Sequence, residues 1–450
     1  MSYYILPKKH TSIEIDPSLI ADILHSTLHS PPLKPIVSHS LISYLKEVNL
    51  QLTNATNVLI IDKDRIECSI DFFCKIVNPY EFIFSKVPGS KFSVSKLKPY
   101  SNMFYIMLEI LTMFNLLEHF TDKNIKTIHF GKNNHATIEC MNMLREDNND
   151  INYELDMSDI NGFLPLHSDS DIDIFSVDFF YFELNNEMYT NDNSYIIGLT
   201  TILCHILTYQ SANGISIIKV DTLFTKPVLD VLYILTSLYD KVCITKPNTS
   251  RANKTDRYIV CKNFIYNTSK IPENKMHLIK LTNILTTCAQ QNKSISSLIK
   301  NDLPYYFLNK VEDSNIIIGH QLVEFTDQLI NIIKNKNRID KIETLKKNNI
   351  QKCIQWCEKY KIPSNKFVDK INIFLPVNIY DENIFLEEIR TGVNLFEEVE
   401  EDSTYLGLGY QSRGCNGTEG VVADPEYGTL VEYSDTFVDA NANADMNIII

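Results

Sequence analysis

The sequence predicts an α/β protein: a sheet of buried strands with helical N- and C-terminal extensions and an acidic, flexible tail. The clearest signal lies in the stretch from Gly214 to Phe264. Ile215 to Val220 is a continuous run of β-forming and mostly apolar residues, which is typical of a strand buried on both faces. Pro227 then opens a segment whose apolar residues recur with helical spacing. A strand followed by a helix indicates an α/β sheet.

The remainder of this stretch predicts a hairpin at one end of the sheet. Two apolar runs, residues 241–245 and 258–261, flank a polar and basic loop at residues 246–256. Lys219 lies inside the preceding strand, where a lysine needs either a partner or a chemical task.

The same patterns predict further elements in chain order. We expect helices over 17–29, 38–50, 101–120, 137–144, 194–209, 272–291, 294–299 and 323–360, and strands over 57–62 and 371–377.

Length and composition predict more than one unit in this 450-residue chain. We expect an accessory segment over 1–85, the sheet domain over 86–268, a mainly helical domain over 269–395 and the tail over 396–450. The tail holds 12 acidic residues and one basic residue between 397 and 450, so it carries −11 of the formal charge of −14. The rest of the chain is nearly neutral, which permits an RNA-binding body, while the tail suits a protein partner.

The ten cysteines form no CxxC pair, which argues against a zinc site and favours a reducing, cytoplasmic compartment. No signal peptide or membrane-spanning stretch is expected. The wealth of Asn, Ile and Lys suggests an AT-rich genome such as that of a large DNA virus, so the host cytoplasm or a virion is the expected location.

One motif connects the hairpin to a known family. Lys246-Pro-Asn-Thr-Ser-Arg251, four residues, then Asp256-Arg-Tyr-Ile-Val resembles the KPxxSRxxxxExYIV signature of FtsJ-like ribose 2′-O-methyltransferases. The resemblance extends over roughly residues 90–264 and implies the first, second and fourth strands of the family's sheet at 126–131, 151–156 and 171–178. It implies a Rossmann-like sheet, S-adenosylmethionine as the methyl donor and RNA as the substrate, with the capped end of mRNA as the expected target.

The resemblance also implies catalytic residues, because the family uses a Lys-Asp-Lys-Glu tetrad. Lys219 matches the central lysine, Asp178 is expected at the carboxyl end of its strand, and Asp256 replaces the glutamate. The first lysine falls on Ile106 when Glu109 is matched to the family's acidic residue; in another register, Lys96 or Lys98 takes that place.

Two further sets of residues follow from the resemblance. The turn after the strand at 126–131 implies methyl-donor contacts from Gly131 and Asn133, the acidic end of the next strand implies one from Asp156 or from Glu154, and Asp178 is expected to contribute from its own strand. For RNA, the basic residues of two loops are the candidates, together with one serine: Lys96, Lys98, Lys246, Ser250 and Arg251.

Other interpretations remain open. Only Gly131 remains of the family's GxxPGG turn, and without the other glycines Cβ atoms would crowd the ligand. The same fold could therefore serve as an inactive pseudo-methyltransferase, an RNA-binding or scaffold module, in which His135 or its neighbours fill the methyl-donor pocket. A structural protein with a chance match to the signature is the third possibility.

Overall fold

The computed structural model describes residues 2–8, 13–18, 20–22, 33–61, 70–155, 173–184, 192–265, 271–291, 293–365, 367–368 and 397–398. The predicted strand at 371–377, nearly all of the acidic tail and Asp156 lie outside these residues, as does most of the predicted helix at 17–29.

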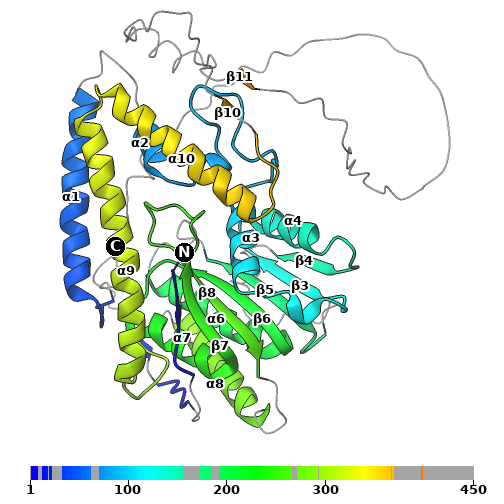
Figure 1. Ribbon diagram of the computed structural model, residues 1–450. Coiled ribbons are helices and arrows are strands. Elements are labelled where there is room, and N and C mark those ends of the chain that lie inside the picture. The colour runs from blue at the N-terminus through cyan, green and yellow to red at the C-terminus, as the bar shows by residue number, and fades with distance from the viewer. Residues whose placement is uncertain are drawn as a thin grey trace, which may run out of the picture.

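A seven-stranded sheet forms the centre of the described chain, in the order β1-β7-β8-β6-β5-β3-β4 (Figure 1). Four neighbouring strands are parallel, and the hairpin and the N-terminal strand add three antiparallel pairings, β6 with β8, β8 with β7 and β7 with β1. The strands are β1 (Ser2–Ile5), β3 (Lys126–Phe130), β4 (Ile151–Leu155), β5 (Val177–Glu183), β6 (Gln210–Val220), β7 (Tyr239–Lys246) and β8 (Arg257–Phe264). This mixed sheet confirms the predicted Rossmann-like α/β class.

Helices cover both faces of the sheet because its central strands are apolar on both sides. On one face, α3 (Met103–Met113) and α4 (Asn134–Leu144) pack in a core with Phe179, Tyr181 and Ile217. On the other face, α6 (Asp192–Tyr209), α7 (Lys226–Leu238) and α8 (Ile271–Gln291) pack in a second core that includes Phe180, Phe182 and Ile218. The alternation along β5 and β6 thus divides their side chains between the two layers.

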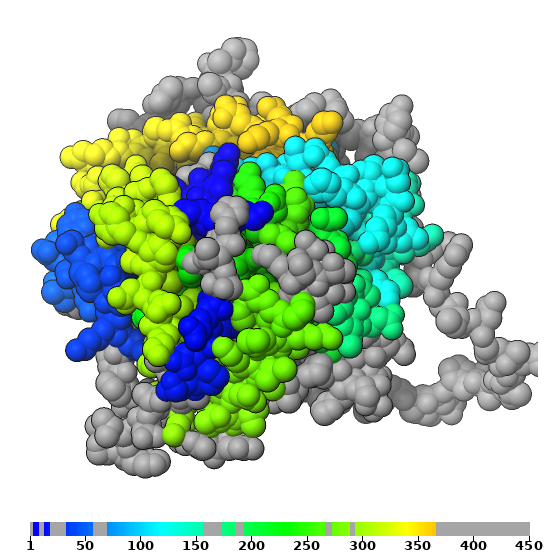
Figure 2. Space-filling view, turned by 90° about the horizontal axis from the view of Figure 1, so that it is seen from below, coloured from blue at the N-terminus to red at the C-terminus, as the bar shows by residue number. Residues whose placement is uncertain are grey.

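Two long helices extend the molecule on the hairpin side. α9 (Tyr305–Lys334) packs against α1 (His39–Ile61), and α10 (Ile339–Lys359) packs against α2 (Ile70–Val77) and η1 (Glu81–Ile83). Gly319 lets α1 and α9 approach, since a Cβ there would lie 2.6 Å from a methyl of Leu41. From below, the N-terminal residues (dark blue) lie between α9 (yellow-green) and the green sheet domain (Figure 2). The remaining short elements are η2 (Glu118–Phe120) and the strand pairs β2 (Ile20–Asp22) with β9 (Lys293–Ile295) and β10 (Phe367–Val368) with β11 (Glu397–Glu398).

Several element predictions were wrong. The described part of the predicted helix at 17–29 contains strand β2, and the single helix predicted over 323–360 is divided between α9 and α10. Residues 57–61 continue helix α1 instead of starting a strand, because the apolar run simply extends an established helix. The predicted helix at 294–299 begins as strand β9. The strand predicted over 171–178 instead starts at Val177 and runs to Glu183. Its carboxyl end is therefore at Glu183 and not at Asp178.

Candidate active site

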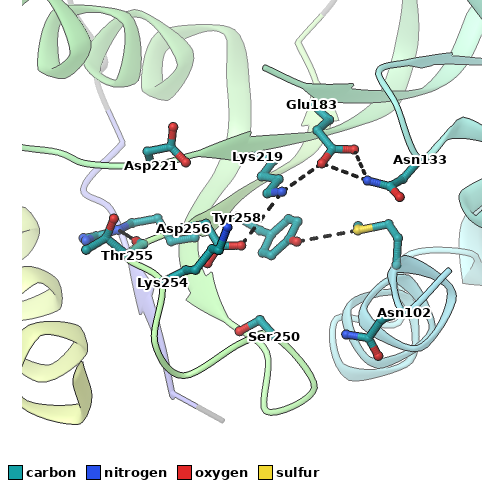
Figure 3. Close-up of polar contacts among 12 residues, drawn as sticks. Asn102, Asn133, Glu183, Lys219, Asp221, Ser250, Lys254, Thr255, Asp256 and Tyr258 are labelled. Carbon is teal, nitrogen blue, oxygen red and sulfur yellow. Dashed lines mark hydrogen bonds and ion pairs between the residues drawn. The ribbon is translucent and has the colours of Figure 1, made fainter. Parts of the chain in front are cut away.

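A row of alternating charges lies at the carboxyl edge of the parallel strands. Glu183 ends β5, Lys219 is the penultimate residue of β6, and the two are register partners. The Lys219 Nζ donates a hydrogen bond to Glu183 Oε1 at 2.8 Å and lies 4.0 Å from Asp256 Oδ2 (Figure 3). Asp256, just before β8, also accepts from Lys246 Nζ at 3.3 Å. Open α/β sheets place their ligands at this edge.

Burial and neighbouring charge fix the ionisation of this row. Burial alone would lower the pKa of Lys219, but Tyr258 and the carboxylates of Glu183 and Asp256 raise it above the ordinary value of a lysine. Burial opposes ionisation of Asp256, yet Lys246 and Lys219 hold its pKa below the ordinary value. Lys219 is therefore a stable cation held between two anions, with 22% of its side chain exposed. Such a group can orient an oxygen atom and stabilise negative charge on it.

Glu183 was missed in the sequence, and Asp178 was misplaced. Because β5 starts at Val177, Asp178 is its second residue and lies at the opposite end from Lys219. Its carboxylate accepts hydrogen bonds from Lys123 Nζ at 2.7 Å and from Ser211 Oγ at 2.7 Å. Asp178 therefore braces the amino end of the parallel strands. It contacts neither the turn between β3 and α4 nor the charged row formed by Glu183, Lys219 and Asp256. The unbroken apolar run from Phe179 to Phe182 was the signal that could have identified Glu183 as the strand-end acid.

The loop at residues 246–256, which carries the family signature and is called the signature loop below, is held by hydrogen bonds from its own buried side chains. Lys246, predicted to contact RNA, is buried, and its Nζ donates to the carbonyl oxygens of Lys254 at 2.7 Å and Asp256 at 2.9 Å. Ser250 is buried too and donates to the carbonyl of Pro247 at 2.7 Å. Both placements correct the prediction that these side chains meet phosphate, because their polar atoms already brace the loop.

The exposed basic residues are the ones free to meet RNA. Arg251 and Lys254 project from the signature loop, and Lys96 and Lys98 are exposed on the loop before α3. Lys96 and Lys98 form no ion pair with Glu183 or Asp256 among the contacts of the described residues, so neither is seen to complete the tetrad.

The position of the first lysine is apolar. Ile106 is 7% exposed and packs in the core between α3 and the sheet. Glu109, one turn further along α3, is fully buried and accepts hydrogen bonds from the backbone N–H groups of Asn248 and Thr249, both at 3.1 Å. Helix α3 thus supports the signature loop but adds no cation to the row.

The β3–α4 turn forms the other half of the site. Gly131 has φ +131°, and a Cβ on it would lie 2.7 Å from the Cβ of Glu183, so only glycine fits here. Asn133 donates two hydrogen bonds to the Glu183 carboxylate, at 2.9 and 3.1 Å. His135 lies 3.2 Å from Glu154, near the end of β4. Asn133, and not His135, therefore lies against Glu183, the acid at the end of β5.

The donor set of this turn suits a methyl donor with an ammonium and a ribose. Glu183 offers a carboxylate for an amino group, and Glu154, whose side chain is 39% exposed, offers one for ribose hydroxyls. The carboxamide of Asn133 already engages Glu183, so it must share or release that carboxylate when a ligand binds.

The described residues contain no group of three or more His, Cys, Asp and Glu side chains placed to hold a metal ion. None of their helices has the length and apolar character needed to cross a membrane.

Comparison with known proteins relates the chain to RNA methyltransferases. A stretch of 121 residues is 31% identical to the cap-specific mRNA (nucleoside-2′-O-)-methyltransferase 1 of Dictyostelium discoideum. It covers 26% of this chain and 15% of that protein, so this chain spans only a small part of the relative's length. No family model matches the chain. A solved structure described as a ribosomal RNA methyltransferase of Plasmodium falciparum aligns with 37% of this chain and 99% of its own, at 16% identity and a TM-score of 0.29.

The sequence match confirms the resemblance to FtsJ-like ribose 2′-O-methyltransferases, and the class it supports is that of RNA methyltransferases in general.

Proposed function

We propose that this protein is an RNA ribose 2′-O-methyltransferase that uses S-adenosylmethionine, with the capped end of mRNA as its substrate. The observation that carries the proposal is the convergence of Glu183, Lys219 and Asp256 at the carboxyl edge of the sheet. Glu183 and Lys219 lie at the ends of β5 and β6, and Asp256 directly precedes β8; Glu183 and Asp256 are buried and Lys219 is half-buried.

Lys219 is the residue that acts on the ribose. Its ammonium donates a hydrogen bond to the 2′-oxygen, aims that oxygen at the methyl group and stabilises the negative charge that grows on it as the hydroxyl proton passes to solvent water. Glu183 and Asp256 keep the ammonium charged and fix its position. Asp256 is a positioning residue, since it acts through Lys219, whereas Glu183 also faces the proposed methyl donor.

The β3–α4 turn is the proposed site of the methyl donor. S-adenosylmethionine supplies an activated methyl group on its sulfonium when bound. Gly131 provides the tight turn, Glu183 accepts from the amino group, and Glu154 or Asp156 accepts from the ribose hydroxyls. Asn133 retains its place beside Glu183 or rotates away.

Exposed cations supply the proposed RNA contacts. Arg251 and Lys254 on the signature loop, with Lys96 and Lys98, lie outside the buried row and are free to pair with phosphates. Binding through them would weaken as salt rises, because counterions compete for the phosphates.

A second function is favoured by two specific observations. Ile106 leaves the first tetrad position apolar, and Asn133 already binds the acid that faces the methyl donor. With both changes, the domain could bind RNA without transferring a methyl group.

Isothermal titration with S-adenosylmethionine separates the two. Micromolar binding by the wild type, kept in Lys219→Ala and in the exposed-lysine control Lys241→Ala, supports an enzyme whose Lys219 serves the RNA side. Absence of binding at millimolar ligand, with RNA binding intact, contradicts methyl transfer by this chain alone and supports the inactive module.

A further inference from the structure

A cleft of about 250 Å³ lies between the signature loop and helices α9 and α10, where the appended helices meet the sheet domain. Its walls come from α9 and α10, and its base comes from the end of α2 and the signature loop. Lys246 lines the cleft and also pairs with Asp256, so the cleft adjoins the charged row through a single side chain.

The two helical walls carry polar stripes at helical spacing. On α9, Gln321 lies three and four residues before Glu324 and Phe325, and Gln328 lies four and three residues after them, so the four share one helix face. A helix face directed at a core would be apolar at these positions, and here only Phe325 is. Gln321, Glu324 and Gln328 are exposed, so their polar groups are open to a ligand that enters the cleft.

The rest of the cleft is lined by residues of α10 and of the chain just after α2. Tyr80 is half-buried at the base, and Leu345, Asn349 and Lys352 form the α10 stripe. Asn349 is 1% exposed; its Nδ2 donates to the carbonyl of Ile76 at 2.8 Å, which fixes the orientation of the amide. Its Oδ1 has no partner among the described residues, and a ligand N–H that displaced the side chains covering it would supply one.

The chemistry of this lining selects a planar base with hydrogen-bond donors. Aromatic rings stack on unpaired bases, and side chains then read the Watson–Crick edge. The cleft is smaller than the usual range of about 300–1,000 Å³ for drug-sized ligands, so it suits one base. An ionised carboxylate such as Glu324 only accepts hydrogen bonds, and guanine alone among the four bases offers two neighbouring N–H groups on that edge.

We infer that this cleft binds one unstacked guanine base of single-stranded RNA, with Glu324 reading its donor edge. The inference rests on the proposed function, because the RNA is the substrate presented to Lys219. The appended helices thereby select which RNA the signature loop meets.

Fluorescence anisotropy with two labelled five-nucleotide RNAs tests this inference. Both are uridine chains, one with a central guanosine and one with a central adenosine. The wild type should bind the guanosine RNA about tenfold tighter, the discrimination typical of one bidentate contact to a base. Glu324→Gln should abolish the preference, and Asp327→Asn, which makes the same charge change on α9 outside the cleft, should keep it.

Three results would overturn the inference: no preference in the wild type, an unchanged preference in Glu324→Gln, or GMP binding as tightly as the guanosine RNA, which would assign the cleft to a free nucleotide. The measurement needs no methyl donor. A guanine preference without any methyl transfer would therefore contradict the proposed function alone, and methyl transfer without the preference would contradict this inference alone.

Discussion

The two halves of the candidate site differ in how much of their chemistry the chain keeps. On the RNA side, Lys219, Asp256 and the signature loop form a connected, buried set of charges. On the methyl-donor side, the β3–α4 turn keeps one glycine and places an asparagine on the strand-end acid. The two halves therefore depend on different parts of the fold. The charged residues are placed by the register of the strands, which the whole sheet fixes, whereas the methyl-donor half depends on the sequence of a single turn.

The largest expected effect is on the RNA half. Lys219→Ala should lower the methyl-transfer rate by about a hundredfold or more, since it removes the group that orients and stabilises the reacting oxygen. The rate is measured with labelled S-adenosylmethionine and short RNA. Lys241→Ala, on an exposed position of β7, should remain at the wild-type rate; an equal loss in both variants would contradict a special role for Lys219.

The support of the signature loop gives the next effect. Glu109→Ala leaves the N–H groups of Asn248 and Thr249 without their acceptor, so the free energy of unfolding should fall by about 3 kcal/mol. Chemical denaturation measures it. The exposed Glu118→Ala on the following turn should change stability by less than about 0.5 kcal/mol. Similar small losses in both would mean that the loop does not depend on this carboxylate.

A pH effect probes the structure beneath the methyl-donor turn. His129 on β3 is buried and lies 2.7 Å from Thr137 of α4, and burial lowers its pKa to about 3. In the unfolded chain it takes up a proton below its ordinary value of 6.5, while the folded protein does not, so stability falls as pH drops from 6.5 toward 3. Relative to His129→Gln, the wild type should lose about 2 kcal/mol more between pH 7 and pH 5. Parallel pH curves for the two proteins would contradict a neutral, buried His129.

The smallest expected effect concerns the methyl-donor half of the site. Asn133→Ala frees the Glu183 carboxylate from two hydrogen bonds, so the affinity for S-adenosylmethionine should rise about fivefold. Titration calorimetry measures the change, with Asn142→Ala on α4 as a matched asparagine control. A fall in affinity would show that Asn133 is part of the ligand site instead of an obstacle in it.

The fold was predictable where local patterns act alone. The apolar run of β6, the helix after Pro227 and the β7–β8 hairpin were all located from their periodicity. The errors lie at the boundaries of elements. Acidic and apolar residues alternate over residues 171–178, which mimics a strand, so the predicted strand began six residues before the true start of β5 at Val177.

The candidate site was predictable only in part for the same reason. Lys219 and Asp256 belong to one contiguous stretch, so their spacing located them. Glu183 depends on where β5 ends, and the burial of Lys246 depends on how the loop closes over its side chain. The cleft beside Glu324 forms where helices far along the chain pack against the loop, which no local pattern encodes.

The central claim is that the row around Lys219 methylates ribose. Its most direct test is nucleoside mass spectrometry of capped RNA after incubation with the protein and S-adenosylmethionine. We predict a 2′-O-methylated nucleoside with the wild type and with Lys241→Ala, and none with Lys219→Ala. A methyl group on a base, or no methylation by a wild type that binds both RNA and S-adenosylmethionine, would contradict the claim.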